Sequence, residues 1–296
     1  MQRHSLASVY WGGGLIALTL FRLVLAAFIP LAPDEAYYRI WALAPAAGYF
    51  DHPPMVAVWV RLGMALAGDT AEGVRLMGPL SALLGTLLVV HAAYCWLQQQ
   101  GTQEQVYKGA IRAGALLNGT LAIGLGTLVM TPDTPLLLFM ALMLWALVRA
   151  CVGQQRSMWL VVGLAAGLGF DSKYTALLPG AGLVVWLLVT KDGRKWLITP
   201  WPWLAGCVAA VCVSPVIWWN AHHAWASFLK QGGRVGDWQP ARVLTFMGEL
   251  LGGQVGLASP LVFVFFVAGI GLLWKKRDSF SLLLLCMVAL PMAVFV

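Results

Sequence analysis

Apolar stretches of about 14 to 22 residues recur along the chain and are separated by short polar segments. They lie at about residues 9–30, 74–97, 109–131, 134–150, 158–171, 174–190, 199–219, 255–274 and 280–296. A membrane-spanning helix needs about 20 mostly apolar residues, and the shorter stretches reach that length through their flanks. The pattern therefore predicts an all-α integral membrane bundle with about nine spans.

The first long interruption covers residues 31–54 and has the sequence LAPDEAYYRIWALAPAAGYFDHPP. Two further apolar segments, at about 35–46 and 54–67, lie within it or directly after it. Both are too short to cross a bilayer. We expect them to form helices that lie in the membrane interface.

Composition supports a membrane protein, because 60% of the residues are hydrophobic and only 10% are charged. Soluble domains contain about 25% charged residues. The five cysteines lie in apolar segments without a CxxC pair, which predicts neither a disulfide nor a metal site. The first apolar run is too long for a cleaved signal peptide and is expected to be an uncleaved span. No soluble domain boundary is visible, so residues 1–296 are expected to form one transmembrane domain.

The distribution of basic residues predicts the orientation. With a cytoplasmic N-terminus, eleven Lys and Arg residues fall in short inner loops and helix ends, and seven fall in longer outer loops. The outer seven are Arg39, Arg61, Arg75, Lys173, Lys230, Arg234 and Arg242. Since short cytoplasmic loops are enriched in Lys and Arg, this orientation is favoured. The net charge of +7 then reflects topology and does not indicate nucleic-acid binding.

This topology gathers the candidate polar side chains on the outer side, at or near the ends of spans. They come from four loops: Asp34, Glu35, Asp51, His52, Asp133, Lys173, His222 and His223. Ionisable groups beside membrane segments are costly, and they indicate function by default. The sequence therefore predicts an outward-facing site.

The acidic residues of the first loop also have structural explanations. Asp34 and Glu35 follow a proline and would be favoured in the first turn of a helix, where Glu35 could pair with Arg39. Asp51 could cap a helix that begins at the double proline. These alternatives stay open at this point.

The other candidates allow two interpretations as well. Asp133 in TPDTP could cap the following helix, and the two histidines of WWNAHHAWASF could be polar tips in an aromatic belt. Lys173 in GFDSKY could extend to the interface beside Asp171, or it could hold a phosphate. Two carboxylates and a histidine on one surface could bind a divalent cation, although no ligand spacing on a single helix supports this.

Taken together, the motifs PDEAYY, GYFDHPPM, TPDTPLLLF, SKYTALL and WNAHHAWASF, with a span that starts at Ser259-Pro260, resemble one family in the correct order. The chain is similar to bacterial members of the dolichyl-phosphate-mannose protein mannosyltransferase family (glycosyltransferase family 39). These are GT-C membrane glycosyltransferases related to the lipid A aminoarabinose transferases. The resemblance covers nearly the whole chain and implies a GT-C-type transmembrane bundle.

The resemblance also implies an activity. Such enzymes are inverting glycosyltransferases that move a sugar from a polyprenyl-phosphate donor to an acceptor hydroxyl of a lipid, glycan or protein. The reaction would take place on the periplasmic side of a bacterial inner membrane. It needs a base near the acceptor and a cation near the phosphate leaving group.

Site roles follow from the same resemblance. Asp34 would be the general base, with Glu35 beside it in the catalytic Asp-Glu pair. His52 and Lys173 would contact the donor phosphate. Asp51, Asp133 and His223 would support the site or bind a divalent metal ion. Some relatives carry Glu-Lys where this chain has Asp51 and His52, and histidine is a weaker cation than lysine.

Members of this family usually continue well beyond this length, so the resemblance predicts that the chain is truncated or partial at Val296. Two other function classes compete with the enzyme. One is a transporter or flippase of lipid-linked or anionic substrates, which would carry ionisable groups near the bilayer midplane. The other is a non-catalytic truncated homologue.

Overall fold

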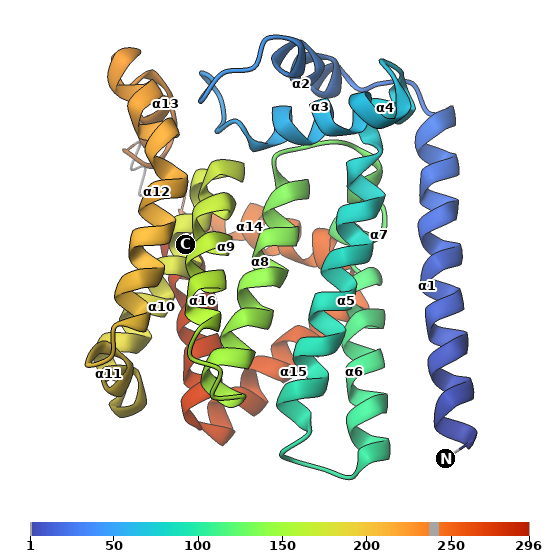
Figure 1. The fold of residues 1–296 in the computed structure, drawn as a ribbon, viewed down its shortest axis with the longest axis vertical. Coiled ribbons are helices and arrows are strands. Elements are labelled where there is room, and N and C mark those ends of the chain that lie inside the picture. Colours follow the sequence, from blue (N-terminus) through green and yellow to red (C-terminus); the bar gives the residue numbers. More distant parts are fainter. Residues whose placement is uncertain (1, 237–242, 296) are drawn as a thin grey trace.

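The computed structural model describes residues 2–236 and 243–295, and this part of the chain contains helices and no strand (Figure 1). Its α-helices are α1 (Gln2–Phe28), α2 (Pro33–Leu43), α3 (Met55–Ala67), α4 (Ala71–Arg75), α5 (Met77–Leu97), α6 (Gln103–Asn118), α7 (Leu121–Gly124), α8 (Asp133–Leu147), α9 (Met158–Ser172), α10 (Leu177–Val189), α11 (Lys191–Leu197), α12 (Trp201–His222), α13 (Ala226–Gly236), α14 (Val243–Ala258), α15 (Pro260–Lys276) and α16 (Ser279–Phe295). Arg242, one of the seven basic residues expected on the outer side, lies outside the described residues.

The long helices form a bundle in which α9 packs between α8 and α12, and α5 packs against α8 and α6 (Figure 1). Gly163 shows how closely α9 approaches α12. A Cβ atom at this position would lie 2.2 Å from the backbone oxygen of Ala205. Small residues at helix contacts allow such an approach within membranes, where packing must replace the hydrophobic effect.

Helices α2, α3 and α4 lie across one end of the bundle, at the top of Figure 1, which we call the α2–α4 end. Their buried core includes Trp41 and Tyr49, whose rings stack with centroids 4.3 Å apart. The Tyr49 hydroxyl donates to the backbone oxygen of Trp41 at 2.9 Å. The short helices expected at about 35–46 and 54–67 are thus confirmed as α2 and α3.

Span number was expected to be about nine. By length and composition, four segments of the described chain can cross a membrane singly: Tyr10–Phe28, Ala71–Leu97, Asp133–Val152 and Trp201–His222. The number rises to seven if the bent pairs α6 with α7, α10 with α11, and α14 with α15 each count as one span. Helices α3, α9 and α16 are shorter apolar helices. The number of nine membrane spans therefore stays a prediction.

Two expected spans differ in shape from the prediction. The run at 109–131 bends by 76° where α6 ends at Asn118 and Thr120 accepts a hydrogen bond from the backbone N–H of Ile123 to start α7. The run at 255–274 is divided at Ser259, whose φ is +65°, and α14 meets α15 at 106°. Pro260 lacks a backbone N–H, so it suits the first position of a new helix.

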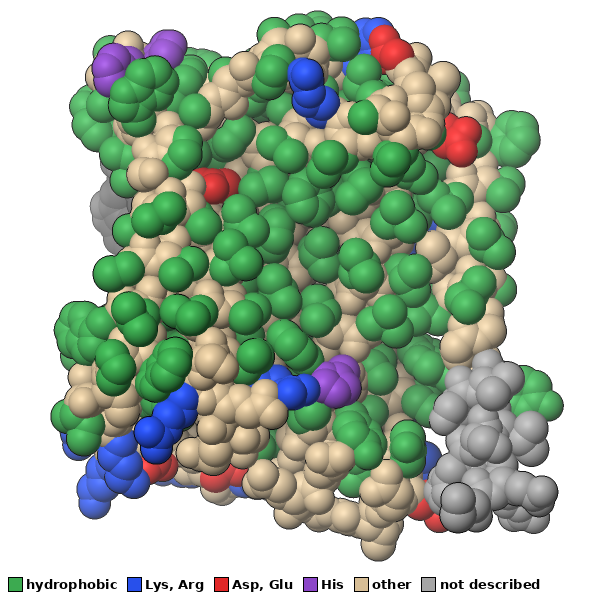
Figure 2. All heavy atoms as spheres, viewed as in Figure 1, with side chains coloured by type: hydrophobic (Ala, Val, Ile, Leu, Met, Phe, Trp, Pro, Cys, Tyr) green, Lys and Arg blue, Asp and Glu red, His purple; other side chains and the backbone are tan. Residues whose placement is uncertain are grey.

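Hydrophobic side chains form a continuous band between two polar ends of the bundle (Figure 2). Basic side chains gather at the end opposite α2–α4, at the bottom of the view, with a few acidic ones among them. A wide apolar belt between polar rims is the surface that lipid tails and water require. The chain is an integral membrane protein of the all-α class.

Candidate active site

Asp34 and Glu35 are neighbours in the first turn of α2 but have opposite surroundings. Pro33 begins the helix, as the sequence suggested, because its fixed φ suits a first helical position. The side chain of Asp34 is exposed, whereas Glu35 is 0% exposed. Consecutive residues point about 100° apart around a helix. Of the two carboxylates, only Asp34 is therefore accessible to a substrate.

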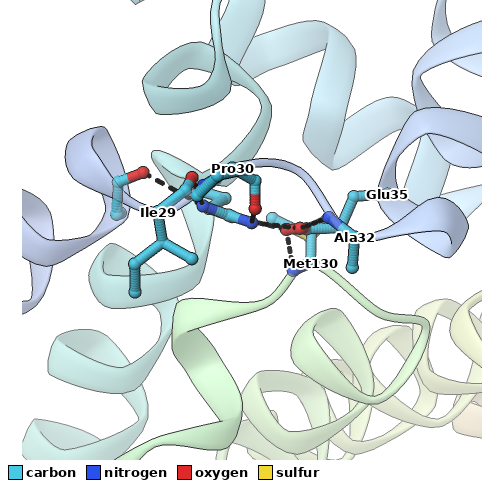
Figure 3. Close-up of polar contacts among 7 residues, drawn as sticks. Ile29, Pro30, Ala32, Glu35 and Met130 are labelled. Atoms are coloured by element: carbon cyan, nitrogen blue, oxygen red, sulfur yellow. Dashed lines mark hydrogen bonds and ion pairs between the residues drawn. The ribbon is translucent and has the colours of Figure 1, made fainter.

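Glu35 accepts hydrogen bonds at both carboxylate oxygens (Figure 3). Its Oε1 accepts from Arg75 Nε at 2.7 Å and from the Met130 backbone N–H at 2.9 Å. Its Oε2 accepts from the Ala32 backbone N–H at 2.9 Å and forms an ion pair with Arg75 Nη2. A buried carboxylate of this kind is stable only when it is paired and hydrogen-bonded, and both conditions are met.

Arg75 extends the same network into neighbouring segments. Its terminal nitrogens donate to the backbone oxygens of Ala26 (3.2 Å), Ile29 and Pro30 (2.8 Å). The arginine thus joins the end of α1 and the following turn to α4, while Glu35 joins them to α2 and to the segment before α8. This network fixes the start of α2, and with it the backbone that carries Asp34.

Glu35 does not pair with Arg39, so that alternative from the sequence is wrong. Arg39 instead donates to both carboxylate oxygens of Asp69, the Nε contact measuring 2.5 Å. The reason is geometric. Glu35 points into the protein, whereas the Arg39 side chain is 35% exposed and meets the turn between α3 and α4.

Asp51 lies between α2 and α3 and binds α13. Its Oδ1 forms an ion pair with Lys230, its Oδ2 accepts from the Tyr37 hydroxyl at 3.0 Å, and its backbone oxygen accepts from Gln231 Nε2 at 2.8 Å. Burial acts to raise the pKa of Asp51, but these side-chain hydrogen bonds and the adjacent positive charge outweigh it and hold the pKa below its usual value. Asp51 is not the cap of α3, since Pro54 occupies that position.

Asp133 and Lys173 form an ion pair 40 positions apart in the sequence. Lys173 Nζ lies 2.8 and 2.9 Å from the two carboxylate oxygens of Asp133. The lysine does not pair with Asp171, which is buried. Asp133 stands in the first turn of α8 and does not cap it, because the cap residue is Pro132. The two side chains are 50% and 31% exposed, so this pair is open to a ligand.

Tyr38 is a buried residue of α2 whose phenol is influenced by the charges of three carboxylates. Its phenol is buried, and burial is the largest cause that raises its pKa to about 12. The negative charges of Asp34, Asp51 and Asp133 each raise it further. Hydrogen bonds bring the same segments together, since the Tyr37 hydroxyl donates to Asp51 and the backbone N–H of Met130, three residues before Asp133, donates to Glu35. The predicted convergence of these residues at one end of the bundle is therefore present in the structure.

The three candidate histidines of the predicted site lie at two places on the α2–α4 end. His52 is half-buried in the loop before α3, with its ring centroid 6.3 Å from that of Tyr38. His223 is exposed after α12, stacks on Trp219 with centroids 4.1 Å apart, and donates from Nδ1 to the Trp219 backbone oxygen at 2.7 Å. His222 makes the equivalent hydrogen bond to Trp218.

A divalent metal ion does not fit these side chains as they are arranged. Within the described residues, no group of three or more His, Cys, Asp or Glu side chains could hold one. Asp51 and Asp133, the carboxylates proposed for it, each have a lysine partner already. We therefore derive no catalytic step through a metal.

Two residues of this site had no functional signal in the sequence. Lys230 was counted only as an outer basic residue, and Arg75 likewise. Lys230 pairs with Asp51, 179 positions away, and Arg75 pairs with Glu35, 40 positions away. No local sequence pattern reveals contacts over such separations. The aromatic ring of Phe50 lies 4.4 Å from Lys230 Nζ, which adds a cation–π contact to the Asp51 pair.

Comparison with known proteins gives one family and several relatives. Residues 51–219 match the family described as Dolichyl-phosphate-mannose-protein mannosyltransferase. The lipid A galacturonosyltransferase RgtD of Rhizobium johnstonii is 26% identical over 95% of this chain and 58% of its own. An undecaprenyl phosphate-alpha-4-amino-4-deoxy-L-arabinose arabinosyl transferase of Erwinia tasmaniensis is 26% identical over 83% of this chain and 45% of its own. The chain thus spans about half the length of these relatives.

Two solved structures share the fold. ArnT from Cupriavidus metallidurans in the apo state has a TM-score of 0.71 and 21% identity, over 98% of this chain and 55% of its own. The same protein bound to undecaprenyl phosphate has a TM-score of 0.69 and 20% identity, over 96% of this chain and 54% of its own. The expected GT-C-type helical fold is confirmed.

Proposed function

Because the chain belongs to the dolichyl-phosphate-mannose-protein mannosyltransferase family, we propose that it is an inverting glycosyltransferase with a polyprenyl-phosphate-linked sugar donor. Two relatives support the donor class. The name of the Erwinia tasmaniensis relative includes undecaprenyl phosphate, and the solved structure of ArnT was determined with that lipid bound. The acceptor is a hydroxyl group of a lipid, glycan or protein.

One observation carries the proposal. An exposed carboxylate, Asp34, stands on a backbone fixed by the buried Glu35–Arg75 pair, at the same end of the bundle as the half-exposed cation Lys173. A base for the acceptor and a cation for the leaving phosphate are the two groups that this reaction needs. Both are held by packed elements, which limits the cost of orienting them during the reaction.

In the proposed reaction, Asp34 takes the proton of the acceptor hydroxyl as its oxygen bonds to the anomeric carbon. The bond between that carbon and the phosphate oxygen breaks, and its electron pair stays on the departing polyprenyl phosphate. A single displacement of this kind inverts the anomeric centre. Glu35 acts as a positioning residue, since its four hydrogen bonds leave it buried away from the substrate.

Lys173 and His52 offset the charge of the departing phosphate. Lys173 exchanges its Asp133 contact for the phosphate when the donor binds, and Asp133 neutralises the lysine between cycles. Charge-assisted bonds to phosphate are stronger than those between neutral groups. Asp51 and Lys230 hold α13 beside the site, and His223 supports the rim after α12.

We place the α2–α4 end in the periplasm of a bacterial inner membrane. The excess of Lys and Arg in the short loops at the opposite end supports this orientation. A polyprenyl-phosphate donor anchored in the lipid would then present its phosphate at the level of Lys173, where α9 ends.

The test is sugar transfer in sealed membrane vesicles. The protein is supplied with radiolabelled undecaprenyl-phosphate sugars or with the corresponding nucleotide sugars. We expect label to move from the lipid-linked donors only, with release of undecaprenyl phosphate. Transfer from nucleotide sugars would contradict the donor class. Movement of the intact donor across the membrane without chemical transfer would instead support a flippase.

A further inference from the structure

Two apolar furrows on the membrane-facing surface meet at His91, near the end of α5 opposite α2–α4. One, about 380 Å³, runs between α5 and α8 and includes Phe139. The other, about 540 Å³, lies between α5, α6 and α1 and includes Trp11 and Tyr107. Both are lined by Leu87 as well as His91, and Leu87 is 49% exposed. The two apolar furrows thus diverge from one polar side chain, His91.

His91 offers a hydrogen-bond donor at that point. Trp145 Nε1 donates to His91 Nδ1 at 2.6 Å, so the neutral ring carries its proton on Nε2. The neighbour of Nε2 is Cys95 Sγ at 3.7 Å, and a thiol is a weak acceptor. The side chain of His91 is exposed, so a stronger acceptor from the surroundings can reach Nε2.

Arg149 adds a positive charge beside the same indole. It stands in a π-helical turn (Val148–Val152) after α8, with its guanidinium carbon 5.5 Å from the centre of the Trp145 ring. Its Nε and Nη2 donate to Gln155 Oε1 at 2.9 and 2.7 Å. In the described part of the chain no carboxylate forms a salt bridge with it. Among residues 2–236 and 243–295, the hydrogen-bond acceptor of the Arg149 guanidinium is therefore the neutral amide of Gln155.

We propose that this surface binds one anionic phospholipid of the leaflet opposite the active site. Its phosphate contacts Arg149 and His91 Nε2, and its two acyl chains occupy the two furrows. His91 lies six residues before the end of α5, about 9 Å along the helix, which suits a phosphate and glycerol at the membrane border. On the face drawn in Figure 2, a basic and a His side chain adjoin at the lower border of the hydrophobic band. The proposal does not depend on the enzymatic function.

Native mass spectrometry of the detergent-solubilised protein tests the headgroup contact. Phosphatidylglycerol and phosphatidylcholine with identical chains are titrated in turn. We expect one tightly bound phosphatidylglycerol, with Arg149→Gln lowering its affinity about tenfold, because a hydrogen bond to a charged group is lost. Arg194→Gln removes the same charge from α11 at the same end and should change the affinity less than about twofold. Equal losses in both variants, or equal retention of both lipids, would overturn the proposal.

A second pair of variants keeps Arg149 intact. Leu87→Trp places an indole where both furrows begin and should reduce phosphatidylglycerol retention about as much as Arg149→Gln does. Leu261→Trp puts the same side chain on α15, at a position that is 70% exposed and lines neither furrow. We expect it to leave retention unchanged. Retention unaffected by Leu87→Trp would show that the chains do not lie in the furrows, which also overturns the proposal.

Discussion

Glu35 and Arg75 form an ion pair whose two side chains are 0% and 1% exposed, although they stand 40 positions apart. The pair joins the first turn of α2 to the end of α4 and, through Met130, to the segment before α8. Directly beside it, Asp34 faces outward. One residue of the Asp-Glu pair thus stabilises the fold, and the other is available for chemistry.

Glu35→Gln should therefore destabilise the protein. Breaking one partner of a buried ion pair costs about 3–5 kcal/mol, since the remaining charge has no partner. We expect a clear drop in the thermal unfolding midpoint in detergent. Asp34→Asn is the matched control on the adjacent, exposed position and should change stability by about 0.5 kcal/mol or less. Equal stability of the Glu35→Gln and wild-type proteins would refute the structural role of this pair.

Lys173→Ala should weaken donor binding. Its side chain is 31% exposed and pairs with Asp133, so it can turn to a phosphate. The apparent KM for a polyprenyl-phosphate donor should rise about tenfold with little change in the amount of folded protein. Lys173→Arg keeps the charge and should be milder. If donor kinetics stay at the wild-type level in the alanine variant, Lys173 is an interfacial anchor and not a phosphate ligand.

The Asp51–Lys230 pair predicts a pH effect on stability. The pKa of Asp51 in the folded protein lies below the ordinary value of 3.8. Its contribution is therefore fully present above about pH 4 and is lost as the pH falls through the lowered native pKa. Thermal midpoints of wild type and Lys230→Met should differ by a constant amount between about pH 5 and 8, and the difference should shrink below about pH 4. A difference that grows on acidification would contradict the pairing.

Orientation can be tested with single cysteines in a background that lacks the five native ones. A cysteine at Asp69, at the α2–α4 end, should react with an impermeant thiol reagent from the periplasmic side. One at Asp192, in α11 at the opposite end, should not. Asp237 was a third suitable position, but it lies outside the described residues. A reversed labelling pattern would place the site in the cytoplasm.

Much of the fold followed from the apolar runs, because helices that face lipid must be apolar over most of their length. The bends at Asn118 and Ser259 did not, since the predicted apolar runs at 109–131 and 255–274 continue across each break. The motif analysis placed the start of a span at Ser259-Pro260, but the bend of 106° between α14 and α15 became visible only in the structure. Helix α13 was missed because its sequence, ASFLKQGGRVG, is too polar and too short to predict a span.

The gathering of Asp34, Asp51 and Asp133 at one end was predictable from topology alone. Their partners were not, because ion pairs between distant segments depend on side-chain packing. Glu35 illustrates the limit. The sequence offered Arg39 as a partner at helical spacing, and the structure gives Arg75 from another helix. A sequence motif does not distinguish the roles of two adjacent acidic residues, whereas their burial in the structure does.

The central claim is that Asp34 is the general base. Asn keeps the shape of Asp and serves equally well near a helix start, so Asp34→Asn should fold, insert and bind donor as the wild type does. It lacks the basicity, and positioned acid–base groups contribute about 10²- to 10⁴-fold in rate.

The direct measurement is the turnover of Asp34→Asn with a polyprenyl-phosphate sugar, compared with that of the wild-type protein at matched expression. We expect a loss of about 10²-fold or more, with donor KM close to wild type. A variant that keeps more than about a tenth of the wild-type turnover would fall outside that range and contradict the catalytic assignment.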